Sequence, residues 1–285
     1  LSSCGTGTGK MLPAADADNG GLYLPTGFGA LVVVDSIGRT RHIAVNANGD
    51  IYSQLNNSED GKGTIAMRDT NGDGRADSIV RFGDYLDEGR GATGITIHNG
   101  YLYVSSRKII NRTKLSEGEL IPTSKTEIVL TDMDPNVDRN WHTTKPLAFD
   151  DKGNMFVPFG APSDACQDMQ KYGPVGIPGG KGLDPCPELE MHAGIWRFDA
   201  NRTGLTQQDG QKYATGIRSV VGMEWNPKDG SLYAVGNGID NFHTVFPDLY
   251  TSWQAAMLPS ETLMKVTEGS DYGWPYAYYD QIQGK

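Results

Sequence analysis

The chain has 285 residues with 35 acidic and 25 basic side chains, which give a formal net charge of −10. This length suits one large domain or two small ones. The acidic balance argues against a nucleic-acid partner, because phosphate binding needs clustered Lys and Arg. The 37 glycines, the 15 prolines and the lack of a long apolar run predict a soluble, turn-rich, mainly β chain.

Residues 1–22 are expected to be a flexible N-terminal tether, which begins LSSCGTGTGK. Leu-Ser-Ser-Cys resembles the lipobox of bacterial lipoproteins, in which Cys4 would carry the lipid after the signal peptide is cleaved. On this interpretation the protein is exported to the periplasm or the cell surface and is tethered to a membrane. The alternative is a chance cysteine in a disordered terminus.

Residues 23–285 are expected to form one domain built from a repeated unit. After an expected entering strand from Ala30 to Val34, four segments each show a strand, an Asn/Asp-Gly type turn and a second strand. These segments are residues 42–52, 94–104, 147–157 and 223–233. Their turn glycines, Gly49, Gly100, Gly153 and Gly230, are separated by 51, 53 and 77 residues. A period of roughly 40 to 50 residues with short strands is typical of propeller blades.

Residues 69–77, with the sequence DTNGDGRAD, place oxygen-bearing side chains at alternate positions. These side chains are Asp69, Asn71, Asp73 and Asp77. Calcium loops use this pattern, although Val80 stands where an EF-hand needs a bidentate Glu. The sequence therefore predicts either a short structural calcium loop or a solvated hairpin turn.

The widest spacing between units is explained by a Gly- and Pro-rich insertion at residues 160–192. It contains Cys166 and Cys186, which would form a disulfide in an oxidising compartment. Two free buried thiols are the alternative. A zinc site is not expected, since no CxxC motif or nearby His pair accompanies them.

Two residues are candidates for catalysis or ligand binding at the centre of the expected propeller. Among five histidines, His142 stands out because it precedes the third unit on the loop face of a propeller, where ligands gather. Arg218 holds the equivalent position before the fourth unit. Its planar fork suits an anionic ligand, since it binds carboxylates bidentately.

The order of these motifs resembles the glucose/sorbosone dehydrogenase family, with the L-sorbosone dehydrogenase branch the most similar. The resemblance covers residues 24–280 and rests on His142 followed by ATGIR at 214–218, NGID at 237–240, ETL at 261–263 and YGWP at 272–275. Members of this family are six-bladed β-propellers of four-stranded antiparallel blades that bind pyrroloquinoline quinone (PQQ) with calcium. They oxidise sugars or sugar-derived aldehydes and pass the electrons to an external acceptor.

The resemblance implies a role for each matching residue. His142 would be the general base that takes the proton of the substrate while hydride passes to the quinone. Arg218, Ser219, Asn237 and Arg90 would bind the cofactor, which carries three carboxylates. The backbone carbonyls of Gly238 and Ile239 would hold the cofactor calcium, which acts as a Lewis acid.

The chain departs from the family in several places. Ser219 stands where the family usually has Asn, and Ser260 replaces an Asp before Glu261. The chain also stops at Lys285, before the last blades of family members, so it is expected to be a fragment or an incomplete ring. Two alternatives therefore stay open: a propeller that binds carbohydrate without turnover, and a calcium-dependent lactonase that would use Asn237, Asp240 and Glu261.

Overall fold

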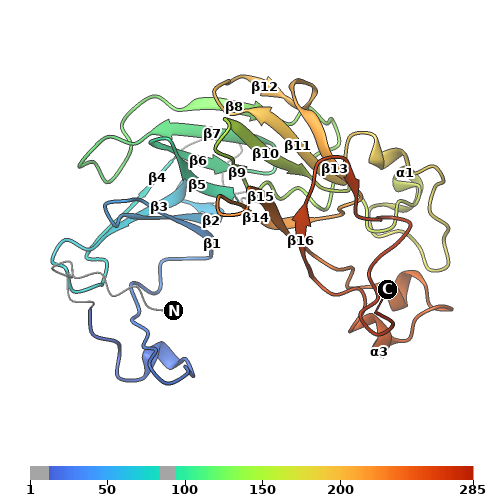
Figure 1. Ribbon diagram of the computed structural model, residues 1–285, viewed down its shortest axis with the longest axis horizontal. Coiled ribbons are helices and arrows are strands. Elements are labelled where there is room, and N and C mark those ends of the chain that lie inside the picture. The colour runs from blue at the N-terminus through green and yellow to red at the C-terminus, as the bar shows by residue number, and fades with distance from the viewer. Residues whose placement is uncertain (1–12, 84–93, 285) are drawn as a thin grey trace.

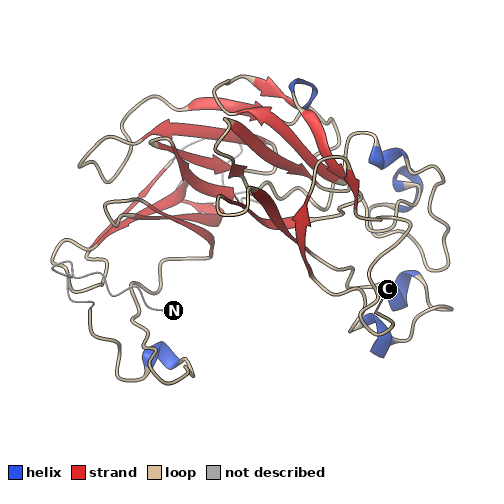
Figure 2. Cartoon of the chain, viewed as in Figure 1, coloured by secondary structure: helices blue, strands red, loops and turns tan. Residues whose placement is uncertain are grey.

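The structure is a computed structural model, and it describes residues 13–83 and 94–284. Four β-sheets follow one another along the chain and lie side by side in an arch (Figure 1). Strands dominate, and the helices are short and lie at the edges (Figure 2). The expected all-β, propeller-like architecture is confirmed, with four blades in this chain, whereas a ring of six blades stays a prediction.

The first two sheets are each an antiparallel meander of four consecutive strands. The first sheet contains β1 (Thr40–Val45), β2 (Ile51–Glu59), β3 (Lys62–Arg68) and β4 (Ser78–Phe82). The second sheet contains β5 (Gly94–His98), β6 (Tyr101–Ser105), β7 (Ile109–Lys114) and β8 (Glu127–Thr131).

The third sheet carries the insertion in the connection between two of its strands, and the fourth sheet has three strands. The third contains β9 (Ala148–Phe149), β10 (Asn154–Phe159), β11 (Gly194–Asp199) and β13 (Gln211–Thr215). The fourth contains β14 (Val220–Asn226), β15 (Ser231–Gly236) and β16 (Thr262–Val266). The segment at 160–192 joins β10 to β11, which are antiparallel neighbours. The insertion therefore leaves the sheet intact.

Two short strands link neighbouring sheets. β12 (Leu205–Thr206) pairs in parallel with β8, the outer strand of the second sheet. β17 (Ser270–Asp271) pairs in the same way with β13 of the third sheet. Each thereby covers an edge that would otherwise expose unpaired backbone groups.

The four predicted hairpins are confirmed as the first two strands of the four sheets. Their turn glycines all have φ between 63° and 95°, a region that other residues avoid. The expected strand from Ala30 to Val34 is wrong, because this segment joins no sheet. Its backbone bonds instead to loop groups, for example the N–H of Val32 to the carboxylate of Asp16 at 2.8 Å.

The hydrophobic core consists of layers between adjacent sheets. Tyr103 and Val129 of the second sheet share one cluster with Trp196 of the third. Phe156 of the third sheet shares another with Leu232 of the fourth. Because each sheet packs on the next, the blades hold the loops at their ends at fixed relative positions.

The helices are all short. They are η1 (Asn19–Gly21), α1 (Met169–Tyr172), η2 (Pro187–Leu189), η3 (Gln207–Asp209), α2 (Phe242–Val245) and α3 (Ser252–Ala255). In the part of the chain that the structure describes, none has the length and apolar character to cross a bilayer.

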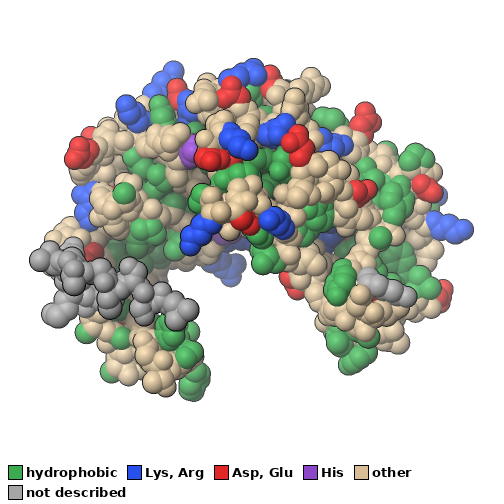
Figure 3. All heavy atoms as spheres, viewed as in Figure 1, with side chains coloured by type: hydrophobic (Ala, Val, Ile, Leu, Met, Phe, Trp, Pro, Cys, Tyr) green, Lys and Arg blue, Asp and Glu red, His purple; other side chains and the backbone are tan. Residues whose placement is uncertain are grey.

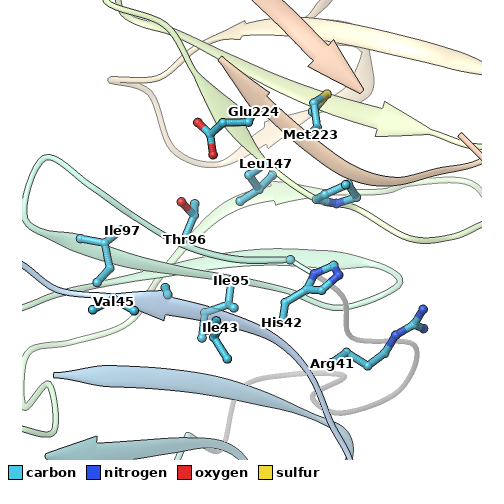
Figure 4. A pocket seen from close by; sticks show the side chains of 14 residues that line it. Arg41, His42, Ile43, Val45, Ile95, Thr96, Ile97, Leu147, Met223 and Glu224 are labelled. Atoms are coloured by element: carbon cyan, nitrogen blue, oxygen red, sulfur yellow. The ribbon is translucent and has the colours of Figure 1, made fainter. Parts of the chain in front are cut away.

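The inner strands enclose a hollow of about 480 Å³ at the centre of the arch. Side chains of β1, β5 and β14 line it, among them His42 and Glu224 (Figure 4). Burial and the charge of Arg41 lower the pKa of His42, so its ring stays neutral at pH 7. His42 is thus an inward-facing residue of the innermost strand.

Candidate active site

His142 lies in the loop that joins β8 to β9, and the backbone fixes one side of its ring. Nδ1 is 2.7 Å from the carbonyl oxygen of Ala161. Because a carbonyl oxygen only accepts hydrogen bonds, Nδ1 carries the proton of the neutral ring. His142 is thus held in the tautomer that leaves Nε2 as its proton-accepting atom.

Arg218 reaches the same place from the turn between β13 and β14. Its Nη1 donates to Nε2 of His142 and to Oδ1 of Asp164, each at 2.6 Å. A guanidinium has no acceptor atom, so the contact with Nε2 requires a neutral imidazole. The structure therefore brings together His142 and Arg218, which the sequence selected separately.

Gly160 makes this meeting sterically feasible. A Cβ on Gly160 would lie 2.2 Å from the carbonyl oxygen of His142 and 3.0 Å from that of Arg218. The next residue, Ala161, donates its N–H to the carbonyl of Arg218 at 2.7 Å. The loops that carry His142 and Arg218 thus pack against one strand end with no room for a side chain.

Asp164 is the third member of the cluster, and sequence reasoning missed it. Its Oδ1 is also 3.4 Å from Nε2 of His142, and its backbone carbonyl accepts the indole N–H of Trp274 at 2.9 Å. Asp164 lies in an insertion without periodicity, where Cys166, two residues away, was the one local signal. Burial would raise the pKa of Asp164, but contact with His142 and the charge of Arg218 outweigh it and hold the pKa below its ordinary value.

The disulfide of the insertion lies two residues from Asp164. Cys166 and Cys186 are bonded, with their Cα atoms 6.1 Å apart. Beside them, the hydroxyl of Ser163 donates to the carboxylate of Glu188 at 2.6 Å. Burial raises the pKa of Glu188. These contacts fix both ends of the segment that positions Asp164.

Two backbone carbonyls complete the surroundings of the Arg218 guanidinium. Nη2 donates to the carbonyl oxygen of Asn237 at 3.2 Å and to that of Gly238. The sequence placed the carbonyls of Gly238 and Ile239 at a calcium ion. In the structure the carbonyls of Asn237 and Gly238 face a cationic side chain.

A pocket of about 850 Å³ opens beside this cluster. Ser219, Asn237, Gly238 and Ile239 line it, as do Asp164 and Arg218. His142 is not among the lining residues, since Arg218 stands between its Nε2 and the pocket. Among the described lining residues Arg218 is the sole cation, and its charge is already paired with Asp164.

The loop at residues 69–77 turns its side chains toward its own backbone. Asp69 accepts the N–H groups of Gly72 and Gly74 at 2.6 and 2.8 Å, and Asp77 accepts the Thr70 hydroxyl at 2.8 Å. Asn71 and Asp73 each accept the N–H group two residues ahead. Across residues 13–83 and 94–284, no three His, Cys, Asp or Glu side chains are grouped so that they could hold a metal ion. Calcium binding by this loop stays a prediction.

Two predicted functional residues lie outside the described residues. These are Arg90, expected at the cofactor, and Cys4, expected to carry a lipid.

Comparison with known proteins gives no match to a family model and none to a curated protein. Solved structures do match. A carbohydrate-active enzyme of family AA12 from Trichoderma reesei superposes with a TM-score of 0.63 at 18% identity, over 88% of this chain and 60% of that one. The PQQ domain of a pyranose dehydrogenase from Coprinopsis cinerea gives 0.62 at 16% identity, over 89% and 58%.

An aldose sugar dehydrogenase from Streptomyces coelicolor, solved with PQQ bound, gives a TM-score of 0.52 at 18% identity, over 87% of this chain and 66% of that one. The chain thus spans between 58% and 66% of the length of these three proteins. It has the fold of these three proteins, and the resemblance first found in the sequence is confirmed at the level of the fold.

Proposed function

We propose that this chain belongs to a PQQ- and calcium-dependent dehydrogenase that oxidises a sugar or a sugar-derived aldehyde or alcohol. The observation that carries the proposal is the cluster of His142, Asp164 and Arg218 at the edge of a large pocket. It supplies a neutral imidazole as base, a buried carboxylate beside it, and oxygen atoms that face a cation. The complete ring would have six blades, as the sequence resemblance implies.

The donor set fits the expected calcium. The guanidinium of Arg218 is a stand-in cation, since two carbonyls and one carboxylate direct their oxygen atoms at it. Oxygen atoms of this kind are the ligands that calcium prefers. The pocket volume lies in the upper part of the range of small-molecule sites, which suits a flat quinone together with a sugar. Asn237 and Gly238 would hold the metal, and Ser219 and Arg218 would contact the cofactor.

When bound, PQQ with calcium supplies the acceptor that takes hydride from the substrate carbon. The protein supplies the base. For Nε2 of His142 to receive the substrate proton, Arg218 must first leave it. Nδ1–H stays on the carbonyl of Ala161, and the carboxylate of Asp164, 3.4 Å from Nε2, stabilises the imidazolium.

The test is a titration of the metal-stripped protein with PQQ at several calcium concentrations, followed by dye reduction with aldoses and sorbosone. Wild type is expected to bind PQQ only with calcium and to turn over. His142→Ala is expected to keep PQQ binding and lose roughly 100- to 10,000-fold in kcat, the usual contribution of a general base. His243→Ala is the matched control, because His243 is exposed and outside the pocket. Failure to bind PQQ at any calcium level would overturn the proposal.

A second candidate function is a propeller that binds carbohydrate without redox turnover. The observation that favours it is Arg218, which occupies Nε2 of His142 and separates the base from the pocket. In that case sugars would bind to the protein while dye reduction stayed at background with PQQ and calcium present.

We also propose that the protein is exported and anchored through a lipid on Cys4. The Cys166–Cys186 disulfide supports export, because such bonds persist in oxidising compartments. Thiol titration of the denatured protein is expected to find no free thiol among its three cysteines if Cys4 is acylated, and one if it is not. Three free thiols would contradict export.

A further inference from the structure

One side of the 850 Å³ pocket is a wall of aromatic rings contributed by two separate segments. Phe242 and Phe246 come from α2 and its C-terminal end, Tyr250 follows them, and Tyr278 comes from the C-terminal loop. The ring of Phe242 is the hub, with centroids 5.7 Å from Phe246, 4.7 Å from Tyr250 and 5.4 Å from Tyr278. We call these four residues the aromatic wall.

The polar ends of the wall are also joined. The hydroxyl oxygens of Tyr250 and Tyr278 are 3.0 Å apart, so one donates to the other. Burial, together with the hydrogen bond to Tyr250, raises the pKa of Tyr278. The Tyr278 phenol therefore stays neutral at any physiological pH. One of the two keeps an O–H to donate, and both keep lone pairs that accept.

The rim of the wall is apolar and open. Leu249, Tyr276 and Tyr279 line the pocket and are 71%, 58% and 57% exposed. Hydrophobic side chains gather at this end of the molecule, around α3 and the C-terminus (Figure 3). The hydroxyl of Tyr276 accepts the backbone N–H of Cys186 at 2.7 Å, which ties the rim to the disulfide-bonded insertion.

We propose that the aromatic wall is a saccharide subsite, which binds one pyranose ring by its C–H face while the Tyr250–Tyr278 hydroxyl pair bonds to ring hydroxyls. Ring faces carry negative electrostatic potential and attract the weakly positive C–H groups of a sugar. Neutral donors and acceptors beside an apolar face match a polyhydroxylated ring. The wall itself does not match an anion, because none of its four residues is a cation.

This inference rests on the proposed function for its ligand class and adds where the sugar is held. The same pocket contains Arg218 at one part of its lining and the wall at another. A saccharide on the wall would thus share a single cavity with the catalytic cluster. The wall is expected to act on KM and on the choice of sugar, whereas His142 acts on kcat.

The experiment measures sugar binding to the full chain without PQQ, by saturation-transfer NMR and calorimetry, with glucose and cellobiose as probes. Sorbitol is the acyclic control, since it has hydroxyls but no ring face. Tyr250→Ala and Tyr278→Ala are each expected to weaken binding of the cyclic sugars by roughly 10-fold, the value of one aromatic contact. Tyr278→Phe keeps the ring, and is expected to lose roughly 5-fold through the missing hydroxyl. Tyr23→Ala, at a fully exposed ring outside the pocket, should change nothing.

The outcomes separate this inference from the proposed function. Tyr250→Phe and Tyr278→Phe both retain the aromatic packing. If each bound sugars as tightly as wild type, the subsite would be overturned even if turnover were observed. If substitutions in the aromatic wall weaken the binding of cyclic sugars but no turnover is observed with PQQ and calcium, the subsite would be established and the proposed dehydrogenase function would be overturned. Sorbitol binding as tightly as glucose would overturn stacking.

Discussion

The guanidinium of Arg218 donates a hydrogen bond to Nε2 of His142 across 2.6 Å. The nitrogen that would accept a substrate proton is therefore already occupied by this hydrogen bond. The same guanidinium pairs with Asp164, and both side chains are less than 10% exposed. A single buried cation thus links the base, its carboxylate partner and two backbone carbonyls. Stability and base activity at this site therefore depend on the same residues.

Asp164→Asn is expected to destabilise the protein by about 3 kcal/mol, because it removes the carboxylate that is paired with the buried Arg218 charge. Urea unfolding at pH 7 measures this loss. Asp229→Asn is the matched control, since Asp229 pairs with Lys265 at the surface, where ion pairs contribute little. An Asp164→Asn variant as stable as Asp229→Asn would show that the buried pair does not form.

Stability is expected to fall as the pH drops below about 7, with His192 among the groups responsible. Burial lowers the pKa of His192 in the folded state, although Asp134, 3.1 Å away, opposes the shift. As the pH falls through the ordinary value of 6.5, the unfolded chain binds a proton that folded His192 does not yet bind, and unfolding is favoured. His192→Gln should flatten this part of the curve.

Urea midpoints at pH 5, 6, 7 and 8 check this prediction. His243→Gln, at an exposed site, should leave the curve as in wild type. His42 and His98 also have lowered pKa values, so His192→Gln should reduce the slope without removing it. An unchanged slope would contradict the assignment.

Gly160→Ala is expected to cost about 2 kcal/mol and to impair the site, because its Cβ would overlap the carbonyl oxygen of His142. Gly222→Ala is the control, since a Cβ there meets no atom within 4 Å and its φ is ordinary. Thermal unfolding and sugar-dependent dye reduction are the measurements. Equal effects of the two substitutions would argue against the close approach of the loops.

The loop at residues 69–77 can be tested for calcium by thermal unfolding with and without the metal. If the loop binds calcium, the melting temperature should rise with calcium concentration by mass action, and Asp73→Ala should abolish the rise. Asp209→Ala, which removes an acidic side chain elsewhere on the surface, should preserve it. A calcium response that Asp73→Ala leaves intact would assign the metal to another site.

The sequence alone located the first two strands of each of the four sheets. Alternating apolar residues and Asn/Asp-Gly turns are local signals, so the hairpins around Gly49, Gly100, Gly153 and Gly230 could be located. The stretch from Ala30 to Val34 is apolar too, but a strand needs a partner, and this one bonds to loop groups instead. His142 and Arg218 were found because each precedes a hairpin.

Only the tertiary structure determined which residues meet. Asp164 lies 54 residues from Arg218 in sequence, within an aperiodic insertion, and no local pattern marks it as the partner of the guanidinium. Tyr278 meets Tyr250 across 28 residues in the same way. Periodicity reports which face of a strand is buried, whereas contacts between loops depend on how neighbouring sheets pack, and that packing is a property of the whole arch.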